Sequence, residues 1–193
     1  MSSRVEQKEA TRRRLITQAV RLVGEQGFAH TRTVDVARAA KVSHGTVFAH
    51  FPSREDLVLA VAGHIGRELT DRLHELVGSG SGLREVLEAH LRCLEENEGA
   101  YRQLVVEAPL MPEEFRATWV GLQSAVASYL CAAAEAEASW GRIRVLPAHL
   151  VFNTWIGLVH HYMVNKDLFV PEGSVIAVHG PALIGHFMTL LHT

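Results

Sequence analysis

The stretch from Thr33 to Phe51, TVDVARAAKVSHGTVFAHF, constrains the fold more than any other part of the chain. Its pattern predicts two short helices joined by a turn. Thr33 is expected to cap the first helix with its hydroxyl, and Ser43 the second. The second helix, residues 44–50, has only about two turns and contains Gly45, so it needs neighbouring helices to be stable.

Apolar side chains are spaced to dock this helix pair on a core. We expect the core positions to be Val34, Val36, Ala37, Val47 and Phe51. The side chains expected to point away from that core are His44, Thr46, Phe48 and His50. A short, docked helix that presents polar and aromatic side chains is typical of a helix-turn-helix that enters the major groove of DNA.

Three motifs follow one another between Leu15 and Val61: LITQAVRLVGEQGF, TRTVDVARAAKVSHGTVFAHF and PSREDLVLAV. In this order they resemble the DNA-binding domain of tetracycline-repressor-type (TetR family) transcriptional regulators. Phe48 stands where that family most often has tyrosine, so the phenolic hydroxyl that would bond a phosphate is absent.

The resemblance assigns residues to the DNA interface one by one. The residues that it places against DNA are Ser43, His44, Gly45, Thr46, Phe48 and His50. It also implies that Thr33 and Arg54 clamp a flanking phosphate, with Lys41 as a further phosphate contact. We expect His44 and Thr46 to read base edges, and Phe48 to touch a thymine methyl group or the backbone.

Charge is divided unevenly along the chain. Residues 1–54 carry ten Lys/Arg and four Asp/Glu, whereas residues 55–193 carry nine and seventeen, within an overall net charge of −2. A basic module on an acidic body is expected if only the first part meets phosphate.

The chain lacks signals for export or membrane insertion. No apolar run reaches the ~18 residues needed to cross a bilayer, and the N-terminus is polar and charged. Cys93 and Cys131 are isolated, without metal or redox spacing. We therefore expect a cytoplasmic protein with free thiols and no membrane contact.

Taken in order, the chain predicts helices throughout. Residues 1–10 are expected to form a mobile arm, and a first helix opens near Arg12 and ends at Gly27. Ser53, with Asp56 three residues on, begins a long connecting helix at about 54–77. Glycine and serine at 78–82 predict a linker.

Further helices are expected at 83–98, 99–107, 113–138, 148–164 and 175–191, and no alternating strand pattern occurs. The fold class is therefore all-α. The expected domains are a helix-turn-helix DNA-binding domain at 1–54, the connecting helix at about 54–77, and a helical effector-binding and dimerisation domain at 78–193.

The last two helices, 148–164 and 175–191, are apolar on more than one face, so both faces should be buried. The resemblance implies that this helix pair forms a four-helix interface in a homodimer, which would place two recognition helices on a palindromic operator. The expected interface residues are Leu158, Tyr162, Leu183, Ile184, Phe187 and Leu190.

The second domain must then hold the signal that the protein answers. Candidate pocket residues are the aromatic and polar-tipped ones on its central helices: His90, Cys93, Tyr101, Trp119, Gln123, Phe152, Asn153, Trp155 and His160. For each of these residues, ordinary core or dimer packing is a more common role than ligand contact. Their content suggests a small hydrophobic or aromatic effector.

Two other kinds of regulator and an enzyme are the alternative functions. Twelve histidines raise the possibility of a metal sensor, but a metal site needs three or four converging ligands, and His160 and His161 point about 100° apart on a helix. A ligand-independent architectural DNA-binding protein is the other alternative. No glycine-rich phosphate loop, G-x-S-x-G or H-E-x-x-H is present. We expect a ligand-responsive regulator, a repressor by resemblance, that is not an enzyme and has no cofactor or metal.

Overall fold

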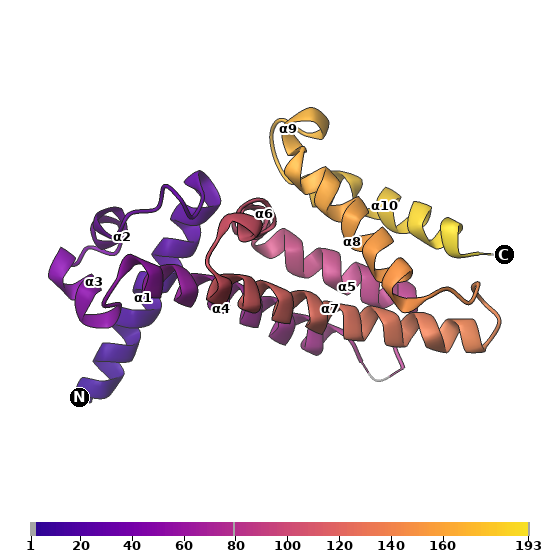
Figure 1. Ribbon diagram of the computed structural model, residues 1–193, viewed down its shortest axis with the longest axis horizontal. Helices are drawn as coiled ribbons and strands as arrows, with labels where there is room; N and C mark the ends of the chain where they lie inside the picture. The colour runs from indigo at the N-terminus through magenta and orange to yellow at the C-terminus, as the bar shows by residue number, and fades with distance from the viewer. Residues whose placement is uncertain (1–2, 79, 193) are drawn as a thin grey trace. The chain divides into compact units, whose positions relative to one another are not determined.

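The computed structural model describes residues 3–78 and 80–192, which fold into helices joined by short loops (Figure 1). The helices are α1 (Arg4–Gln26), α2 (Thr33–Ala39), α3 (His44–His50), α4 (Arg54–Leu76), α5 (Leu83–Glu96), α6 (Glu98–Glu107), a 3-10 helix η1 (Ala108–Leu110), α7 (Glu113–Ser139), α8 (Ala148–Val164), α9 (Lys166–Phe169) and α10 (Val175–Leu191). None of the described residues lies in a β-strand, and the all-α prediction is confirmed. Within the same residues, no helix has the length and apolarity needed to cross a membrane.

The first helix begins earlier than expected. Ser3 Oγ accepts a hydrogen bond from the backbone N–H of Glu6, and the Glu6 carboxylate accepts one from the backbone N–H of Ser3. This capping box, followed by strong helix formers, starts α1 at Arg4. The prediction of a mobile arm is therefore wrong for residues 4–10, and residues 1–2 lie outside the described part.

The two helices of the helix-turn-helix form where the sequence predicts them. Ser43 caps α3, since its Oγ accepts from the Thr46 N–H at 3.1 Å. The prediction for Thr33 as a cap is wrong: Arg32 occupies the cap position without a side-chain bond, and Thr33 is the first helical residue. Four of the five expected core residues are buried, but Val34 is 42% exposed because it lies about 200° around α2 from Val36.

The connecting helix α4 begins with reciprocal bonds between Ser53 and Asp56. The carboxylate of Asp56 accepts from the Ser53 N–H at 3.0 Å and from its hydroxyl at 2.7 Å, while Ser53 Oγ accepts from the Asp56 N–H. This start at Arg54 and the end at Leu76 match the expected bounds closely. The linker expected at 78–82 joins α4 to α5, and its residue Ser79 lies outside the described part.

The chain divides into two compact units. Unit 1 contains the residues up to Gly66 together with Gly99–Trp119, and unit 2 contains Arg67–Glu98 and the residues from Val120 on. Helices α4, α6 and α7 each contribute residues to both units. The units therefore differ from the division at 54 and 78 expected from sequence, because residues 99–119 pack with the N-terminal helices; the domain bounds stay a prediction.

In unit 1, the segment 99–119 packs directly on α1. A Cβ on Gly24 would lie 3.3 Å from the backbone nitrogen of Ala100, and one on Gly99 would lie 3.2 Å from the Gly24 carbonyl oxygen. Glycine at both positions lets the two backbones approach closely. The ring of Phe28 meets that of Phe115 edge to face, with centroids 5.0 Å apart.

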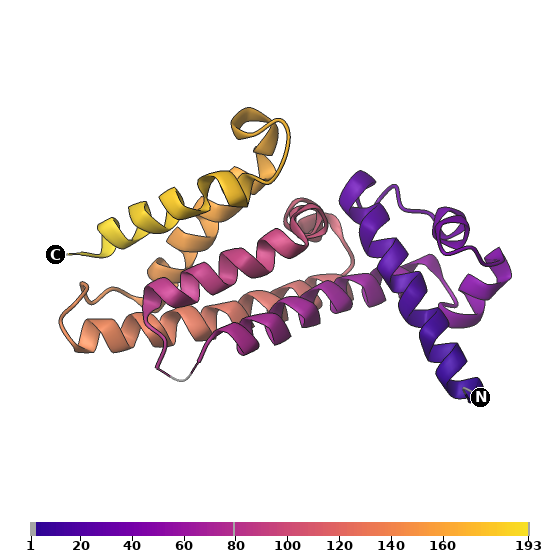
Figure 2. The same ribbon diagram turned by 180° about the vertical axis from the view of Figure 1, so that it is seen from behind.

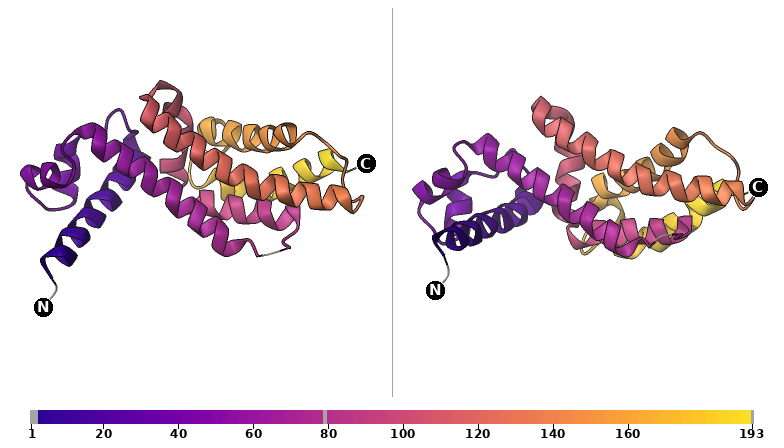
Figure 3. Two further views of the ribbon diagram at one scale, coloured as in Figure 1. Left: turned by 60° about the horizontal axis from the view of Figure 1, so that its bottom comes forward. Right: turned by 90° about the horizontal axis from the view of Figure 1, so that it is seen from below.

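In unit 2, helices α5, α8 and α10 pack together (Figures 1 and 2). Trp155 and Phe187 are fully buried among them, with ring centroids 5.3 Å apart. The later turns of α4 and α7 run side by side (Figure 3), where His74 Nδ1 lies 2.8 Å from the hydroxyl of Tyr129. The short helix α9 was not expected from the sequence.

The start of α10 is held by the carboxylate of Glu98. It accepts from the backbone N–H groups of Val175 at 3.1 Å and Ile176 at 3.3 Å, and from the Ser174 hydroxyl. The first N–H groups of a helix have no partner within the helix, and a negative charge there is favoured by the helix dipole. Glu98 therefore holds the N-terminal turn of α10, which lies far away in the sequence.

Candidate nucleic-acid interface and effector region

The residues expected to face DNA lie at the surface of unit 1. Those that are exposed are Lys41, Ser43, His44, Gly45 and Phe48, while Thr33, Thr46 and His50 are half-buried. Val47 is fully buried and Phe51 is 2% exposed. One side of α3 is thus anchored in the core, and the other side is exposed to solvent.

Contacts within the pair orient the presented side chains. The Nε2 atom of His44 lies 2.9 Å from Thr33 Oγ1, and its ring meets the ring of Phe48 with centroids 4.9 Å apart. Thr46 Oγ1 lies 2.8 Å from Ser43 Oγ. The imidazole is therefore held between α2 and the next turn of α3. Lys41, in the turn, has a left-handed backbone with φ of 54°.

Arg54 has a different place from the one expected. Its guanidinium donates to the carbonyl oxygens of Thr31 at 3.3 Å, Ala29 at 3.1 Å and Phe28. The half-buried side chain therefore organises the loop that precedes α2, which argues against the expected phosphate clamp.

A carboxylate holds the same loop from α6. Glu107 accepts from the backbone N–H groups of Phe28 and Ala29, both at 2.8 Å. Gly27, with φ of 84°, leaves room for it, since a Cβ there would lie 2.5 Å from Glu107 Oε1. Sequence reasoning missed Glu107, because a glutamate 79 positions from Phe28 carries no local signal.

Basic residues of α1 lie beside the end of α3, the expected recognition helix. The guanidinium of Arg12 stacks over the ring of Phe51, 5.0 Å from its centroid. The pKa of His50 is lowered from its ordinary value, first by burial and then by the charges of Lys8 and Arg12, while Glu9 opposes the shift. His50 Nδ1 is buried, without a hydrogen-bond partner among the described residues.

The nine residues expected to line an effector pocket are divided between the units. Tyr101 and Trp119 lie in unit 1, with ring centroids 5.7 Å apart, and the other seven lie in unit 2. Of those seven, His90, Cys93 and Trp155 are buried, Gln123, Phe152 and His160 are half-buried, and Asn153 is exposed. Burial raises the pKa of the Cys93 thiol to about 11, with the nearby Glu96 adding to the shift.

A buried polar pair lies at the centre of the unit 2 group. The indole Nε1–H of Trp155 donates to His90 Nδ1 at 3.2 Å. Burial, with the nearby His160, lowers the pKa of His90 to about 3, and burial lowers that of His160 to about 4. Both rings are therefore neutral at pH 7. In the described part of the chain, the other nitrogen of His90, Nε2, is buried and has no hydrogen-bond partner.

The segment that contains the helix-turn-helix is also the part of the chain that matches a known protein family. Residues 15–61 match the model of the family described as bacterial regulatory proteins, tetR family. Residues 15–61 are therefore similar to the DNA-binding domain of the tetR family. A 60-residue stretch is 43% identical to an HTH-type transcriptional repressor of Mycobacterium tuberculosis, covering 31% of this chain and 32% of the relative. The match thus spans about a third of that relative's length.

Solved structures extend the likeness to the whole fold. A tetR-family regulator from Agrobacterium tumefaciens aligns with a TM-score of 0.79 at 18% identity, covering 96% of this chain and all of that one. The fatty acid degradation regulator FadR from Bacillus halodurans aligns with a TM-score of 0.74 at 17% identity, covering 95% and 97%. These identities show the fold alone. The family consists of transcriptional regulators rather than enzymes, and the sequence-based family assignment is confirmed.

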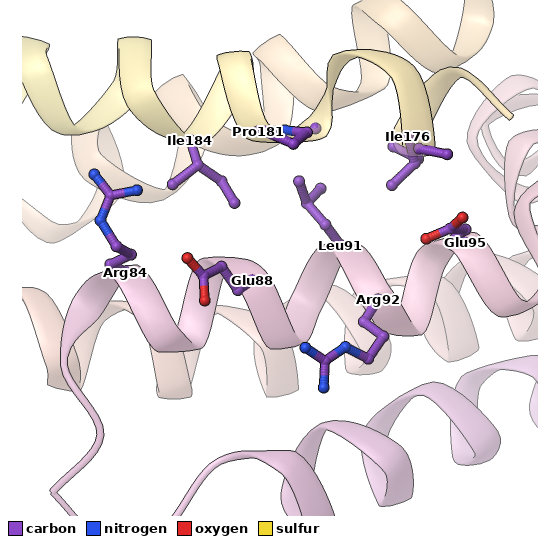
Figure 4. A pocket seen from close by; sticks show the side chains of 10 residues that line it. Arg84, Glu88, Leu91, Arg92, Glu95, Ile176, Pro181 and Ile184 are labelled. Carbon is purple, nitrogen blue, oxygen red and sulfur yellow. The ribbon is translucent and has the colours of Figure 1, made fainter.

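Three pockets open in other parts of unit 2. One of about 340 Å³ lies between α5 and α10, where Leu91, Ile176 and Ile184 form its apolar floor and Arg84 and Glu88 its rim (Figure 4). A second of about 270 Å³ includes Cys131 and the start of α8, and a third of about 560 Å³ lies beside His74 and Tyr129. None of the nine expected residues lines these three pockets.

The residues expected at a dimer interface differ in exposure. Leu183, Ile184 and Phe187 are at most 5% exposed within the single chain, so they do not form its surface. Leu158 and Tyr162 are half-buried and Leu190 is 40% exposed. Within the chain, α10 packs on both α5 and α8, and Phe187 meets the Trp155 ring of α8. The packing on α5 was not revealed by the sequence.

The described residues contain no group of three or more His, Cys, Asp or Glu side chains that could hold a metal ion.

Proposed function

We propose that this chain is a dimeric, ligand-responsive repressor that binds palindromic operators in double-stranded DNA and is released by a small hydrophobic or aromatic effector. The observation that carries the proposal is the form of α3. Val47 and Phe51 anchor this short helix in the core, while His44 and Phe48 are presented at the surface. Such a helix fits the major groove.

Base readout is assigned to the two side chains that local bonds orient. His44, held by Thr33, and Thr46, next to the Ser43 cap, would meet base edges, and the exposed Phe48 ring would meet a thymine methyl group. Lys41 would contact phosphate from the turn. Arg54 is better assigned to the loop it binds than to DNA.

Dimerisation is supported by the outer faces of α8 and α10. Val164 and Leu190 remain 43% and 40% exposed, and Val178 is 60% exposed. A Cβ on Gly157 or Gly185 would meet nothing within 4 Å, so a partner helix could approach these points closely. A two-fold dimer through this helix pair would present two α3 helices to a palindrome.

Sedimentation equilibrium tests the dimer. Leu190→Arg should give monomers, whereas Leu110→Arg, at an 85% exposed position of unit 1, should leave the dimer intact. An unchanged dimer in the first variant would exclude this face.

An effector is supported by the buried pair of unit 2. The Nε2 atom of His90, which carries the proton when Nδ1 accepts from Trp155, is a buried donor suited to an oxygen on an otherwise apolar molecule. A fatty acid degradation regulator shares the fold. The effector would act by binding one dimer geometry better than the other, with α4, which runs through both units, carrying the change.

Selection of genomic fragments by the purified protein, at low and at high salt, tests the function as a whole. A short palindrome enriched at both salt concentrations is expected. Binding that disappears with salt and shows no common sequence would overturn the operator-specific repressor, since non-specific binding is almost entirely electrostatic.

A further inference from the structure

The first three turns of α1 carry a row of basic side chains. Arg4, Lys8 and Arg12 follow one another at intervals of four residues, so they lie along one side of the helix over about 12 Å. Arg4 and Lys8 are exposed, and Arg12 is half-buried. In Figures 1 and 2 these turns project beyond the other helices of unit 1.

The row faces the same way as the buried side of α1. At about 100° per residue, Arg4, Lys8 and Arg12 fall within an arc of about 80°, and the fully buried Leu15 and Ala19 fall within the same arc. That side packs on the rest of unit 1. The N-terminal turns therefore direct their basic row toward the helix-turn-helix rather than away from it.

Other charges of α1 lie on different sides. Glu6 and Glu9 are about 160° and 100° around the helix from Lys8, and Glu6 bonds the N–H of Ser3 in the capping box. Arg13 and Arg14 are about 140° and 120° away from Lys8. The row is thus not cancelled by carboxylates on its own face.

One contact places the end of the row beside α3, and the charges of the row act on the same end of that helix. The Arg12 guanidinium lies over the ring of Phe51, the residue that follows α3. The charges of Lys8 and Arg12 also reach His50, the last residue of α3. A phosphate that approaches the C-terminal end of α3 would therefore lie within the field of this row.

We propose that Arg4 and Lys8 form a phosphate-binding edge on α1, which extends the DNA interface beyond the recognition helix. Its ligand is the backbone of duplex DNA, without regard to sequence. Arg12, stacked on Phe51, is a positioning residue that sets α1 against the end of α3. This edge rests on the proposed function. It also gives the capping box of Ser3 and Glu6 a role, because that box keeps Arg4 helical.

Salt-dependent binding to a mixed-sequence duplex of 40 base pairs tests the edge. The double variant Arg4→Gln/Lys8→Gln should reduce the slope of log K against log salt by about 2, since each phosphate contact contributes about 0.9. Affinity at 100 mM salt should fall about tenfold or more. The control Arg13→Gln/Arg14→Gln removes the same charge from other sides of α1 and should change the slope by less than about 0.5.

The outcomes separate this edge from the proposed function. Equal changes of slope in the two double variants would overturn the edge, since the effect would then be one of net charge. A wild-type chain that does not bind the duplex would overturn the proposed function itself. Hydroxyl-radical footprints on a selected fragment should lose protection only at their outer ends in the Arg4/Lys8 variant; loss across the whole site would contradict an edge contact.

Discussion

His44 and His90 show opposite uses of the same side chain. In unit 1, His44 is exposed on α3 and is held by Thr33 and the ring of Phe48. In unit 2, His90 is buried, accepts the N–H of Trp155 and has its pKa lowered to about 3 by burial. His44 thus stays at the surface of unit 1, where a partner can reach it. His90 is enclosed in unit 2, so its contribution to stability depends on packing and on protonation.

The contrast between the exposed His44 and the buried His90 is tested most strongly by removing Trp155, the partner of His90. Trp155→Ala should reduce the free energy of unfolding by about 3–5 kcal/mol, because it removes a fully buried ring and the partner of His90. Trp140, 59% exposed and stacked on Arg142, is the matched control, and Trp140→Ala should cost less than about 1 kcal/mol. Urea denaturation measures both. Similar losses would show that unit 2 is not organised around its buried pair.

Lowering the pH should reduce the free energy of unfolding through the buried histidines of unit 2. Because the folded-state pKa of His90 is about 3 and the unfolded value is near 6.5, the unfolded chain binds more protons between these pH values. The contribution of the neutral, buried His90 to the free energy of unfolding is therefore fully present above pH 6.5. It is lost as the pH falls toward 3, by up to about 1.4 kcal/mol per pH unit. His160, with a pKa of about 4, adds a loss of the same sign.

The free energy of unfolding, measured from pH 7.5 to 4.5, isolates this effect. His90→Phe should flatten the dependence. If this variant had the same pH dependence as the wild-type chain, the loss in acid would have to come from other groups.

Two glutamates sharpen the contrast between the units. Glu107→Gln should weaken the hold on the backbone N–H groups of Phe28 and Ala29 and cost about 1–3 kcal/mol, since bonds to a charged acceptor are stronger. It should also reduce DNA affinity, because that loop leads into α2. Glu98→Gln should cost a similar amount through α10 while leaving the DNA affinity of folded protein largely unchanged. Anisotropy titrations beside urea melts measure both quantities, and a reversed order in DNA affinity would contradict the assignment of each carboxylate.

The separation of contacting residues along the sequence explains what could be predicted. The helix-turn-helix depends on residues close in the sequence: Ser43 with Thr46, and Ser53 with Asp56. Such bonds are visible as short patterns, and the bounds of α3 and the start of α4 were predicted correctly. The errors there came from choices within a turn, as when Thr33 bonded His44 instead of capping α2.

The remaining contacts depend on residues far apart in the sequence. His90 meets Trp155 across 65 positions, and Glu107 meets Phe28 across 79. Periodicity shows that a helix has an apolar side but not which helix covers it. For that reason Phe187 was expected at a dimer surface and is instead inside the chain.

The smallest expected effects come from two variants of unit 1, which separate base-edge contacts from phosphate contacts. Thr46→Ala should weaken binding to a selected palindrome about tenfold while changing binding to mixed-sequence DNA little, because a base-edge contact is worth about 1–3 kcal/mol. Lys41→Ala should weaken both to a similar extent and reduce the salt slope by about 1, as expected for one phosphate contact. Anisotropy titrations on the two duplexes at several salt concentrations provide all four affinities. Equal losses on both duplexes for both variants would mean that α3 contributes charge and shape but no base readout, and the surface of unit 1 would then hold DNA without reading it.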